Sequence, residues 1–276
     1  IIITLLCGGI SSILLYQAFH QHARPLEIVF LDVGQGDATL IITPNGRTVV
    51  IDTGPKNNLG SLIAPHLPVT DRDIDLLILT HPDLDHVGGT LSLLKSYHVQ
   101  QFMHSGLLAG AEMYEAIAQT ISRERIPAMV GNIGQVIQLD KDVYLEIYSP
   151  HPDFESFEPN DYSVITRLVY RDTSVLLTGD APTTVEHDIS EVYGDRLVSD
   201  ILKIGHHGSL TSTGDFFLEL VQPEYAIISA GCNNRFGHPH SDVLSRLFIH
   251  DIEIFDTCDD GDIMFESDGQ EWIVKE

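Results

Sequence analysis

IDLLILTHPDLDHVGG, at residues 74–89, carries the clearest structural signal in this sequence. The apolar run that opens it is typical of a buried strand, and the Gly88-Gly89 pair lets another segment of backbone approach closely. Between them, two imidazoles and two carboxylates fall within six residues. Histidine nitrogens and carboxylate oxygens are the ligands that hold divalent metal ions. The stretch therefore predicts a metal-binding loop between a strand and a helix; the alternative is an acidic loop with exposed histidines.

Further motifs place the same residue types after other predicted strands. Asp52 closes VVID, and Asp180 closes LLTGD in the second half of the sequence. His206 and His207 lie between glycines, while GHPH at 237–240 supplies two more histidines. An aspartate at a strand end alone is as often turn chemistry as function, and a lone histidine is more often structural. However, six of the 14 histidines fall in these motifs, which favours one shared site.

Apolar patterning predicts short strands in the first part of the chain and alternating strands and helices later. The predicted strands are 27–31, 38–43, 48–52, 74–79, 135–139, 143–148, 164–170, 174–178, 200–203 and 225–229. The predicted helices are 88–97, 111–122, 183–193, 215–221 and 242–250, and a hairpin is expected around Asp259-Asp260-Gly261-Asp262. Since strands precede helices in each half, we predict an α/β (α+β) fold with four layers, an αββα sandwich.

The N-terminal segment differs from the rest of the chain. Residues 1–19 carry no charged side chain. At about 1.5 Å per residue, a helix of this length matches the core of a bilayer. We predict a transmembrane helix with a short linker over residues 1–23 and one further domain over 24–276; a signal-peptide core or a buried helix is the alternative. The first residue is Ile1 rather than Met, so we expect a fragment or a processed product.

Composition excludes several classes of protein. With 43% hydrophobic residues, the chain has enough apolar material for a core, which excludes intrinsic disorder. Three cysteines are too few for a disulfide scaffold, and Cys232 and Cys258 are equally compatible with one disulfide or two free thiols. The formal net charge of −25 argues against broad binding of nucleic acid through a basic surface.

Seven ordered motifs together resemble the metallo-β-lactamase superfamily and, within it, the C-terminal domain of the ComEC DNA-uptake (competence) family. The resemblance covers about residues 26–274. Its motifs are FLDVGQGDATLI (30–41), IDTGP (51–55), HPDLDHVGG (81–89), NDYSVI (160–165), LLTGD (176–180), LKIGHHGS (202–209) and GHPH (237–240). FDTCDDGDIMFE at 255–266 resembles the closing hairpin of that family. One position departs from the superfamily pattern HxHxDH, because Asp83 stands where its second histidine is usual.

The resemblance implies a metal-dependent hydrolase of the metallo-β-lactamase fold, and in this branch a nuclease. It would cleave phosphodiester bonds of one DNA strand during uptake through a membrane channel protein. The implied cofactor is a pair of divalent ions, Mn²⁺ or Zn²⁺, with Mg²⁺ as a further choice. The metal ligands it implies are His81, Asp83, Asp85, His86, Asp180 as the bridge, and His238. The catalytic residues it implies are Lys203, His206, His207 and Asp85. Supporting or undecided positions are Asp52, Asn160, Ser163, Ser209 and His240, with Asp52 expected to orient the histidine loop.

The same resemblance implies the surroundings of the domain. The expected partners are a DNA substrate, the membrane and the other domains of a competence channel, with the domain on the extracytoplasmic side. Two alternatives to the nuclease stay open. One is a hydrolase of a small phosphodiester or ester, which the acidic composition suits better; the other is a non-catalytic assembly module. The metal, the strand polarity, the oligomeric state and the division of roles between His206 and His207 and between His238 and His240 are also left open.

Overall fold

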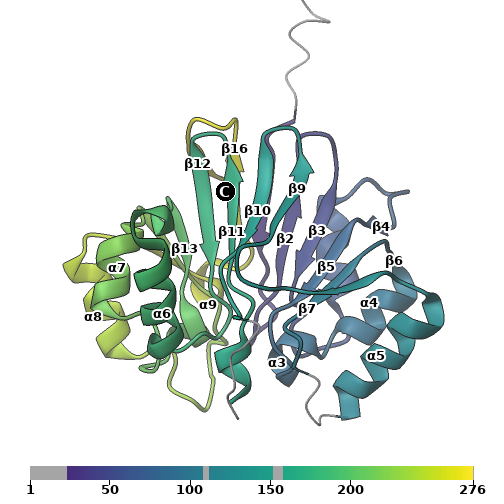
Figure 1. Ribbon diagram of the computed structural model, residues 1–276, viewed down its shortest axis with the longest axis horizontal. Coiled ribbons are helices and arrows are strands. Elements are labelled where there is room, and N and C mark those ends of the chain that lie inside the picture. Colours follow the sequence, from purple (N-terminus) through teal and green to yellow (C-terminus); the bar gives the residue numbers. More distant parts are fainter. Residues whose placement is uncertain (1–23, 108–111, 152–157, 276) are drawn as a thin grey trace, which may run out of the picture.

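The computed structural model describes residues 24–107, 112–151 and 158–275. Two β-sheets pack face to face, with helices α3–α5 outside one sheet and α6–α8 outside the other (Figure 1). The predicted αββα sandwich is therefore confirmed. The transmembrane helix predicted over residues 1–19 lies outside the described residues. Within the described part of the chain, every helix is too short or too polar to cross a bilayer.

The first sheet has eight strands in the order β17-β16-β1-β2-β3-β5-β7-β8. Its strands are β1 (Leu26–Phe30), β2 (Thr39–Ile42), β3 (Thr48–Ile51), β5 (Leu76–Leu79), β7 (Phe102–His104), β8 (Ala128–Val130), β16 (Ile263–Ser267) and β17 (Trp272–Lys275). From β3 to β8 the strands run parallel. Parallel neighbours need long crossovers. These crossovers hold α2 (Leu59–Ile63), α3 (Leu84–Val87), α4 (Thr90–Ser96), α5 (Glu112–Glu124) and the small β4–β6 pair (Asp73–Ile74 and His98–Val99).

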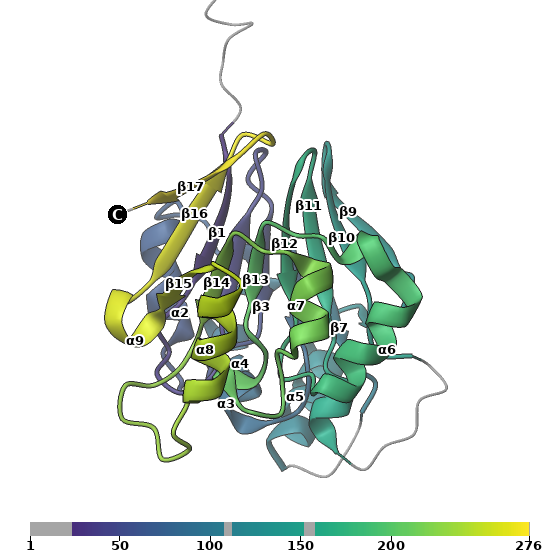
Figure 2. The same ribbon diagram turned by 90° about the vertical axis from the view of Figure 1, so that its left-hand side faces the viewer.

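The second sheet has seven strands in the order β15-β14-β13-β12-β11-β10-β9. Its strands are β9 (Val136–Asp140), β10 (Val143–Ile147), β11 (Thr166–Tyr170), β12 (Thr173–Leu177), β13 (Ile201–Lys203), β14 (Tyr225–Ile228) and β15 (Glu253–Asp256). The helices that cover it, seen from the front in Figure 2, are α6 (Thr183–Tyr193), α7 (Asp215–Val221) and α8 (Ser241–Ile249). The first two match their predicted limits. Short 3₁₀ turns η2 (Pro159–Tyr162) and η4 (Gly205–Gly208) follow β10 and β13.

Alternation along β1 shows how the sequence builds the layers. Ile28 and Phe30 belong to the core between the two sheets, whereas Val29 and Leu31 belong to the core under the helices of the first sheet. Successive side chains of a strand point to opposite faces. Since both faces are covered, the strand is apolar throughout, as expected of a sheet between two layers. A third apolar core, which includes Leu176, lies under α6–α8.

Two predictions about the elements were wrong. The hairpin expected around Asp259–Asp262 is instead helix α9 (Thr257–Asp260), whose first turn is capped by the Asp256 carboxylate accepting from the Cys258 N–H at 2.9 Å. The closing hairpin lies further on, between β16 and β17. The helix predicted over 88–97 begins only at Thr90. Gly88 and Gly89 lie against the backbone of Pro55 and Thr53 with no room for a Cβ, which fixes the metal loop on the neighbouring segment.

Candidate metal centre

Loops from both sheets meet at one edge of the sandwich. Asp52 follows β3, and His81 and His86 follow β5, its parallel neighbour. On the second sheet, Asp180 follows β12 and His207 follows the parallel strand β13. The carboxyl ends of parallel strands share an edge, so residues far apart in sequence arrive together.

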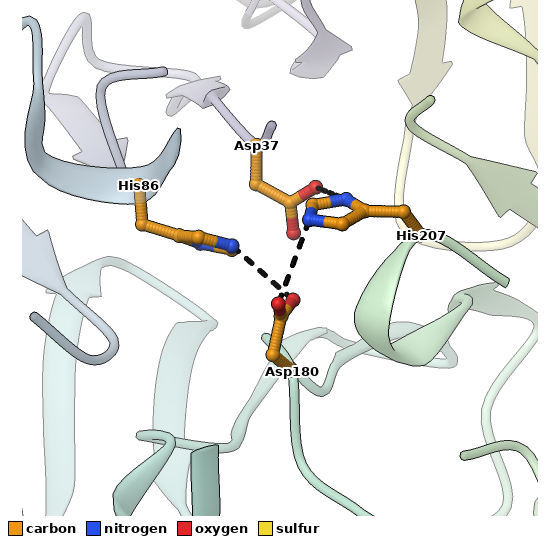
Figure 3. A group of neighbouring side chains, drawn as sticks. All are labelled: Asp37, His86, Asp180 and His207. Atoms are coloured by element: carbon orange, nitrogen blue, oxygen red, sulfur yellow. Dashed lines mark ion pairs between the residues drawn. The ribbon is translucent and has the colours of Figure 1, made fainter. Parts of the chain in front are cut away.

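Four buried side chains form the centre of this cluster: Asp37, His86, Asp180 and His207 (Figure 3). Each offers one nitrogen or oxygen, and these atoms lie within 4.8 Å of one another. Asp180 is the common member, with Oδ1 3.2 Å from His86 Nε2 and Oδ2 3.5 Å from His207 Nε2. None of the four residues is more than 5% exposed. Such a set of two imidazoles and two carboxylates suits a divalent cation.

Unpartnered polar atoms test whether an ion fits. Five buried atoms at this point form no hydrogen bond with the described residues, although contacts of 3.2–3.8 Å with oppositely charged groups surround them. They are Nε2 of His81, His86 and His207, and Oδ1 of Asp37 and Asp180. A buried polar atom without a partner costs about 1–3 kcal/mol. Five such atoms in one place are explained if their lone pairs coordinate an ion. The donor set therefore fits a metal centre.

The charges inside the cluster support the same reading. Burial works against ionisation of Asp180, yet His86 and His207 hold the pKa of this carboxyl well below its usual range. Burial and the neighbouring His86 lower the pKa of His81 to about 3, so its imidazole is neutral at neutral pH. For His207, Asp180 and Asp37 outweigh burial and raise the pKa to about 10. The carboxylates thus attract positive charge to the cluster.

Asp52 holds the histidine loop from behind. Its Oδ1 accepts a hydrogen bond from the Thr80 N–H at 2.8 Å, and its Oδ2 lies 2.7 Å from His86 Nδ1. With Nδ1 engaged, the other ring nitrogen of His86 faces Asp180. A carboxylate behind a ligand histidine fixes its tautomer and ring orientation. Asp52 therefore contacts the histidine loop at Thr80 and at His86.

Lys203 is buried beside the metal centre. Its Nζ is 2.7 Å from Asp37 Oδ2 and also donates to the Ile204 carbonyl at 2.8 Å. The residue is 2% exposed. Its charge is therefore directed at Asp37 inside the protein.

Three more predicted residues surround the mouth with partly exposed side chains. Asp83 Oδ2 lies 3.7 Å from His81 Nε2, and Asp85 Oδ2 lies 3.4 Å from His207 Nε2. His206 Nε2 lies 3.8 Å from Asp180 Oδ2. Each of these groups thus lies within 4 Å of His81, His207 or Asp180.

Other predicted positions have different surroundings. His238 has its ring 5.6 Å from that of His206, and its buried Nδ1 lacks a partner among the described residues. His240 instead caps α8, where its Nδ1 accepts from the Asp242 N–H at 3.4 Å. The Ser163 hydroxyl accepts from the Asp180 N–H at 3.2 Å and so supports the central carboxylate.

The last two predicted positions lie in local turns. Asn160 is part of η2, where its carbonyl accepts from the Ser163 N–H at 3.0 Å. The Ser209 hydroxyl pairs with that of Thr211 at 3.0 Å, next to the bond between Thr211 Oγ1 and His206 Nδ1. Ser209 thus supports the histidine pair indirectly.

Asp37 is the residue that sequence reasoning missed. It follows Gly34-Gln35-Gly36 after β1, inside the motif FLDVGQGDATLI. The backbone of this turn meets the metal loop, because the Asp37 N–H donates to the Asp85 carbonyl at 3.2 Å. The available signal was an aspartate after a glycine turn at a strand end, the same arrangement that marked Asp180.

The thiol question left open by the sequence has an answer in the structure. Cys232 and Cys258 form a disulfide. It joins the loop after β14, which leads to His238, to helix α9. The loop that carries His238 is thereby linked covalently to the helix that follows β15.

Comparison with known proteins gives a consistent result. Residues 31–231 match the family described as the metallo-beta-lactamase superfamily. ComE operon protein 3 of Bacillus subtilis is 32% identical over 94% of this chain and 35% of its own length. Competence protein ComA of Neisseria gonorrhoeae is 34% identical over 85% of this chain and 31% of its own length. The chain thus spans about a third of the length of these curated relatives.

Solved structures show the same fold. The metallo-beta-lactamase fold protein YhfI from Bacillus subtilis superposes with a TM-score of 0.57. The match covers 88% of this chain and 100% of that chain. At 11% sequence identity, this likeness concerns the fold alone.

Proposed function

The chain belongs to the metallo-beta-lactamase superfamily, whose members are generally metal-dependent hydrolases, and from this premise we propose that it is a metal-dependent nuclease. Its substrate would be the phosphodiester backbone of one DNA strand during DNA uptake. The observation that carries the proposal is the buried cluster of Asp37, His86, Asp180 and His207. These residues and the neighbouring His81 together present five polar atoms that form no hydrogen bond with the described residues. The similarity to competence proteins over most of the chain favours DNA as the substrate.

Two divalent ions are proposed, in view of how many donors face Asp180. Asp37, His86, Asp180 and His207 would hold the inner ion. His81, Asp83, Asp85 and His238 are the candidates for the outer one, with Asp180 as the bridge. Oxygen-rich donor sets favour Mn²⁺ or Mg²⁺ more than a three-histidine set does, while Zn²⁺ remains compatible with the imidazoles. When bound, such ions supply Lewis-acid stabilisation to phosphoryl oxygens and acidify water.

The protein's own groups would then share the remaining work. Lys203 balances the charge of Asp37, and Asp52 fixes the ring of His86. His207 Nδ1 donates to the Ser229 carbonyl at 2.9 Å, which leaves Nε2 facing the centre. His206 is more exposed, and its Nδ1 pairs with the Thr211 hydroxyl at 3.0 Å. From this place at the mouth, His206 is the better candidate to protonate the leaving oxygen.

A second function is favoured by one observation. The net charge of −25 repels a polyanion, so a small phosphodiester or ester would approach more easily than duplex DNA. A non-catalytic assembly module is less favoured, because assembly alone does not account for five buried N and O atoms without hydrogen bonds at one point. A domain boundary at residue 24, a membrane anchor over the uncharged residues 1–19 and an extracytoplasmic position belong to the same proposal.

The test compares substrates and metals with a matched pair of variants. The purified chain is given single-stranded DNA or bis(p-nitrophenyl) phosphate, with Mn²⁺, Mg²⁺, Zn²⁺ or chelator. Wild type should cleave DNA with a metal and not with chelator. Asp180→Asn should lose more than about 100-fold in rate, beyond the ~10–100-fold typical of outer partners of a metal site. Asp188→Asn, an exposed carboxyl on α6, should behave as wild type.

Three other outcomes would redirect the proposal. Hydrolysis of the small diester without cleavage of DNA would support the second function. Bound metal with neither reaction would contradict both hydrolase readings for these substrates. Absence of bound metal as well would favour the assembly module.

A further inference from the structure

The loop between β14 and α8 forms one wall of the site, and we call residues 231–240 the rim loop. Figure 2 shows the chain leaving β14 and reaching the start of α8 at the lower edge of the molecule. Its Gly231 N–H donates to the Gln35 side chain at 3.2 Å, in the turn that carries Asp37. At its other end, the His240 N–H donates to the Gly208 carbonyl at 2.9 Å, beside the histidine pair. The rim loop therefore touches two segments that supply the centre.

The rim loop is held in shape by its own contacts. The Asn234 amide oxygen accepts from the N–H groups of Phe236 and His238 at 3.1 and 3.0 Å. The Asn234 amide nitrogen donates to the Gly231 and His238 carbonyls at 2.8 and 2.5 Å. The disulfide from Cys232 adds a covalent attachment. Side chains on this loop are thus presented in a fixed arrangement before any ligand arrives.

A row of neighbouring aromatic rings and one guanidinium leads along the rim loop to the metal centre. The Arg235 guanidinium lies 4.9 Å from the centre of the Phe236 ring. The Phe236 and His238 rings stack with centroids 5.7 Å apart and planes 24° apart. His238 in turn lies 5.6 Å from His206 at the mouth. Phe236 is nevertheless 53% exposed, so a ligand can reach this residue.

We propose that Phe236 and Arg235 form a stacking site for an unpaired nucleobase next to the metal centre, so that the protein takes single-stranded DNA. This inference rests on the proposed nuclease function. Base–aromatic stacking and an arginine beside it are the means by which proteins bind single strands without reading sequence. A duplex keeps its bases stacked on one another, so the Phe236 ring offers it nothing comparable.

The charge of the chain makes this contact more important. With 15 Lys+Arg against 40 Asp+Glu, the protein cannot rely on a basic groove to follow the phosphates. Stacking does not depend on net charge, and Arg235 places one cation where the strand would pass. The rim loop thus contributes affinity for single-stranded DNA, whereas the negative net charge of the protein opposes binding.

The test is an equilibrium binding measurement that does not depend on turnover. Fluorescence anisotropy is recorded with a labelled oligo-dT and with an abasic oligomer of the same length, without added metal and again with Ca²⁺. Wild type should bind oligo-dT more tightly than the abasic strand, by about 5- to 100-fold. Phe236→Ala should bind both strands alike, and Phe236→Trp should restore the preference. Phe248→Ala, which removes an 82% exposed ring on α8, is the matched control and should keep the preference.

Each result bears on the stacking site separately from the nuclease. If wild type does not distinguish the two strands, or if Phe236→Ala keeps the preference, the stacking site is wrong even where DNA is cleaved. If the preference exists and depends on Phe236 but no metal supports cleavage, the stacking site stands and the nuclease proposal fails. Circular dichroism shows whether Phe236→Ala is folded. If it is not, Phe236→Leu, which keeps apolar bulk without a ring, takes its place in the binding test.

Discussion

The metal centre and the rim loop beside it hold their side chains in place by different means. The centre takes one residue from each of four segments spread over both sheets, and all four are buried. The rim loop is more local: Asn234 and one disulfide hold its shape, and Phe236 stays half-exposed. The difference indicates that the centre depends on the entire fold, whereas the exposed side chains Arg235 and Phe236 of the rim loop can change without disturbing it. We therefore expect substitutions at the centre to affect both stability and every substrate, and substitutions at Arg235 and Phe236 to affect polymer binding.

The largest effect is expected where a centre residue depends on a buried partner of opposite charge. Lys203→Met leaves the Asp37 carboxylate buried without its 2.7 Å partner. Removing one member of a buried ion pair costs about 3–5 kcal/mol. Urea unfolding of the metal-free variant should show a loss of this size, and saturating metal should reduce it because an ion would restore the positive charge.

Lys275→Met is the control for that variant, since its Nζ pairs with Glu266 at 2.8 Å on the surface. Exposed pairs contribute about 0–1 kcal/mol. Equal losses in the two variants would show that Lys203 does not serve a buried centre.

Glu186 combines features of the two regions. It is buried, like the residues of the metal centre, but its hydrogen bonds hold a single loop, like those of Asn234 in the rim loop. Its carboxylate accepts from the N–H groups of Thr213 and Gly214, at the start of α7. Burial raises the pKa of Glu186 to about 7, against the hydrogen bonds from these N–H groups. Its contribution to stability is therefore fully present below about pH 4.5 and is lost as the pH rises through 7.

The measurement is the free energy of unfolding of wild type and Glu186→Gln across this range. The difference between them should change by up to about 3 kcal/mol. Glu191→Gln, an exposed carboxyl on the same helix, should follow the wild-type pH profile. A pH profile of Glu186→Gln that parallels wild type would mean that this carboxyl titrates normally in the folded protein.

The smallest effect is expected on the rim loop. Arg235→Gln removes one cation from the path proposed for the strand, without touching the centre. The slope of log affinity for oligo-dT against log salt should fall by about 1, with no change in the free energy of unfolding beyond ~0.5 kcal/mol. Arg123→Gln on α5 is the control and should leave the slope unchanged. A drop in stability together with affinity would place Arg235 among the residues that hold the fold.

The sequence anticipated the parts of the molecule whose signal is local. Helix α6 combines apolar periodicity with a following glycine, and its limits agree with the prediction. By contrast, β8 has three residues in an exposed–intermediate–exposed pattern, which resembles a loop. Its place in the sheet follows from pairing with β7, which lies more than 20 residues earlier. Such pairing leaves no mark in a short window of sequence.

The same division applies to the site. His81 and Asp180 stand just after apolar runs, where the chemistry and the strand end are visible together. Asp37 and Lys203 are paired at 2.7 Å although 166 positions separate them in the sequence. The sequence around one residue therefore does not predict the other as its partner. His240 shows the opposite limit: a histidine in a ligand-like motif is used to cap a helix. Residue type alone does not distinguish these two uses.

The pairing of β1 with β16 has a consequence for how the protein is made. β1 lies between β2 and β16, and Phe30 faces Ile263 across the second of these pairings. During synthesis, the ribosome completes β1 more than 200 residues before β16 emerges. Until then one edge of β1 has no partner, and an unpaired apolar edge invites aggregation. The nascent chain therefore needs protection of that edge, by a chaperone or a neighbouring segment, until its last strands leave the ribosome.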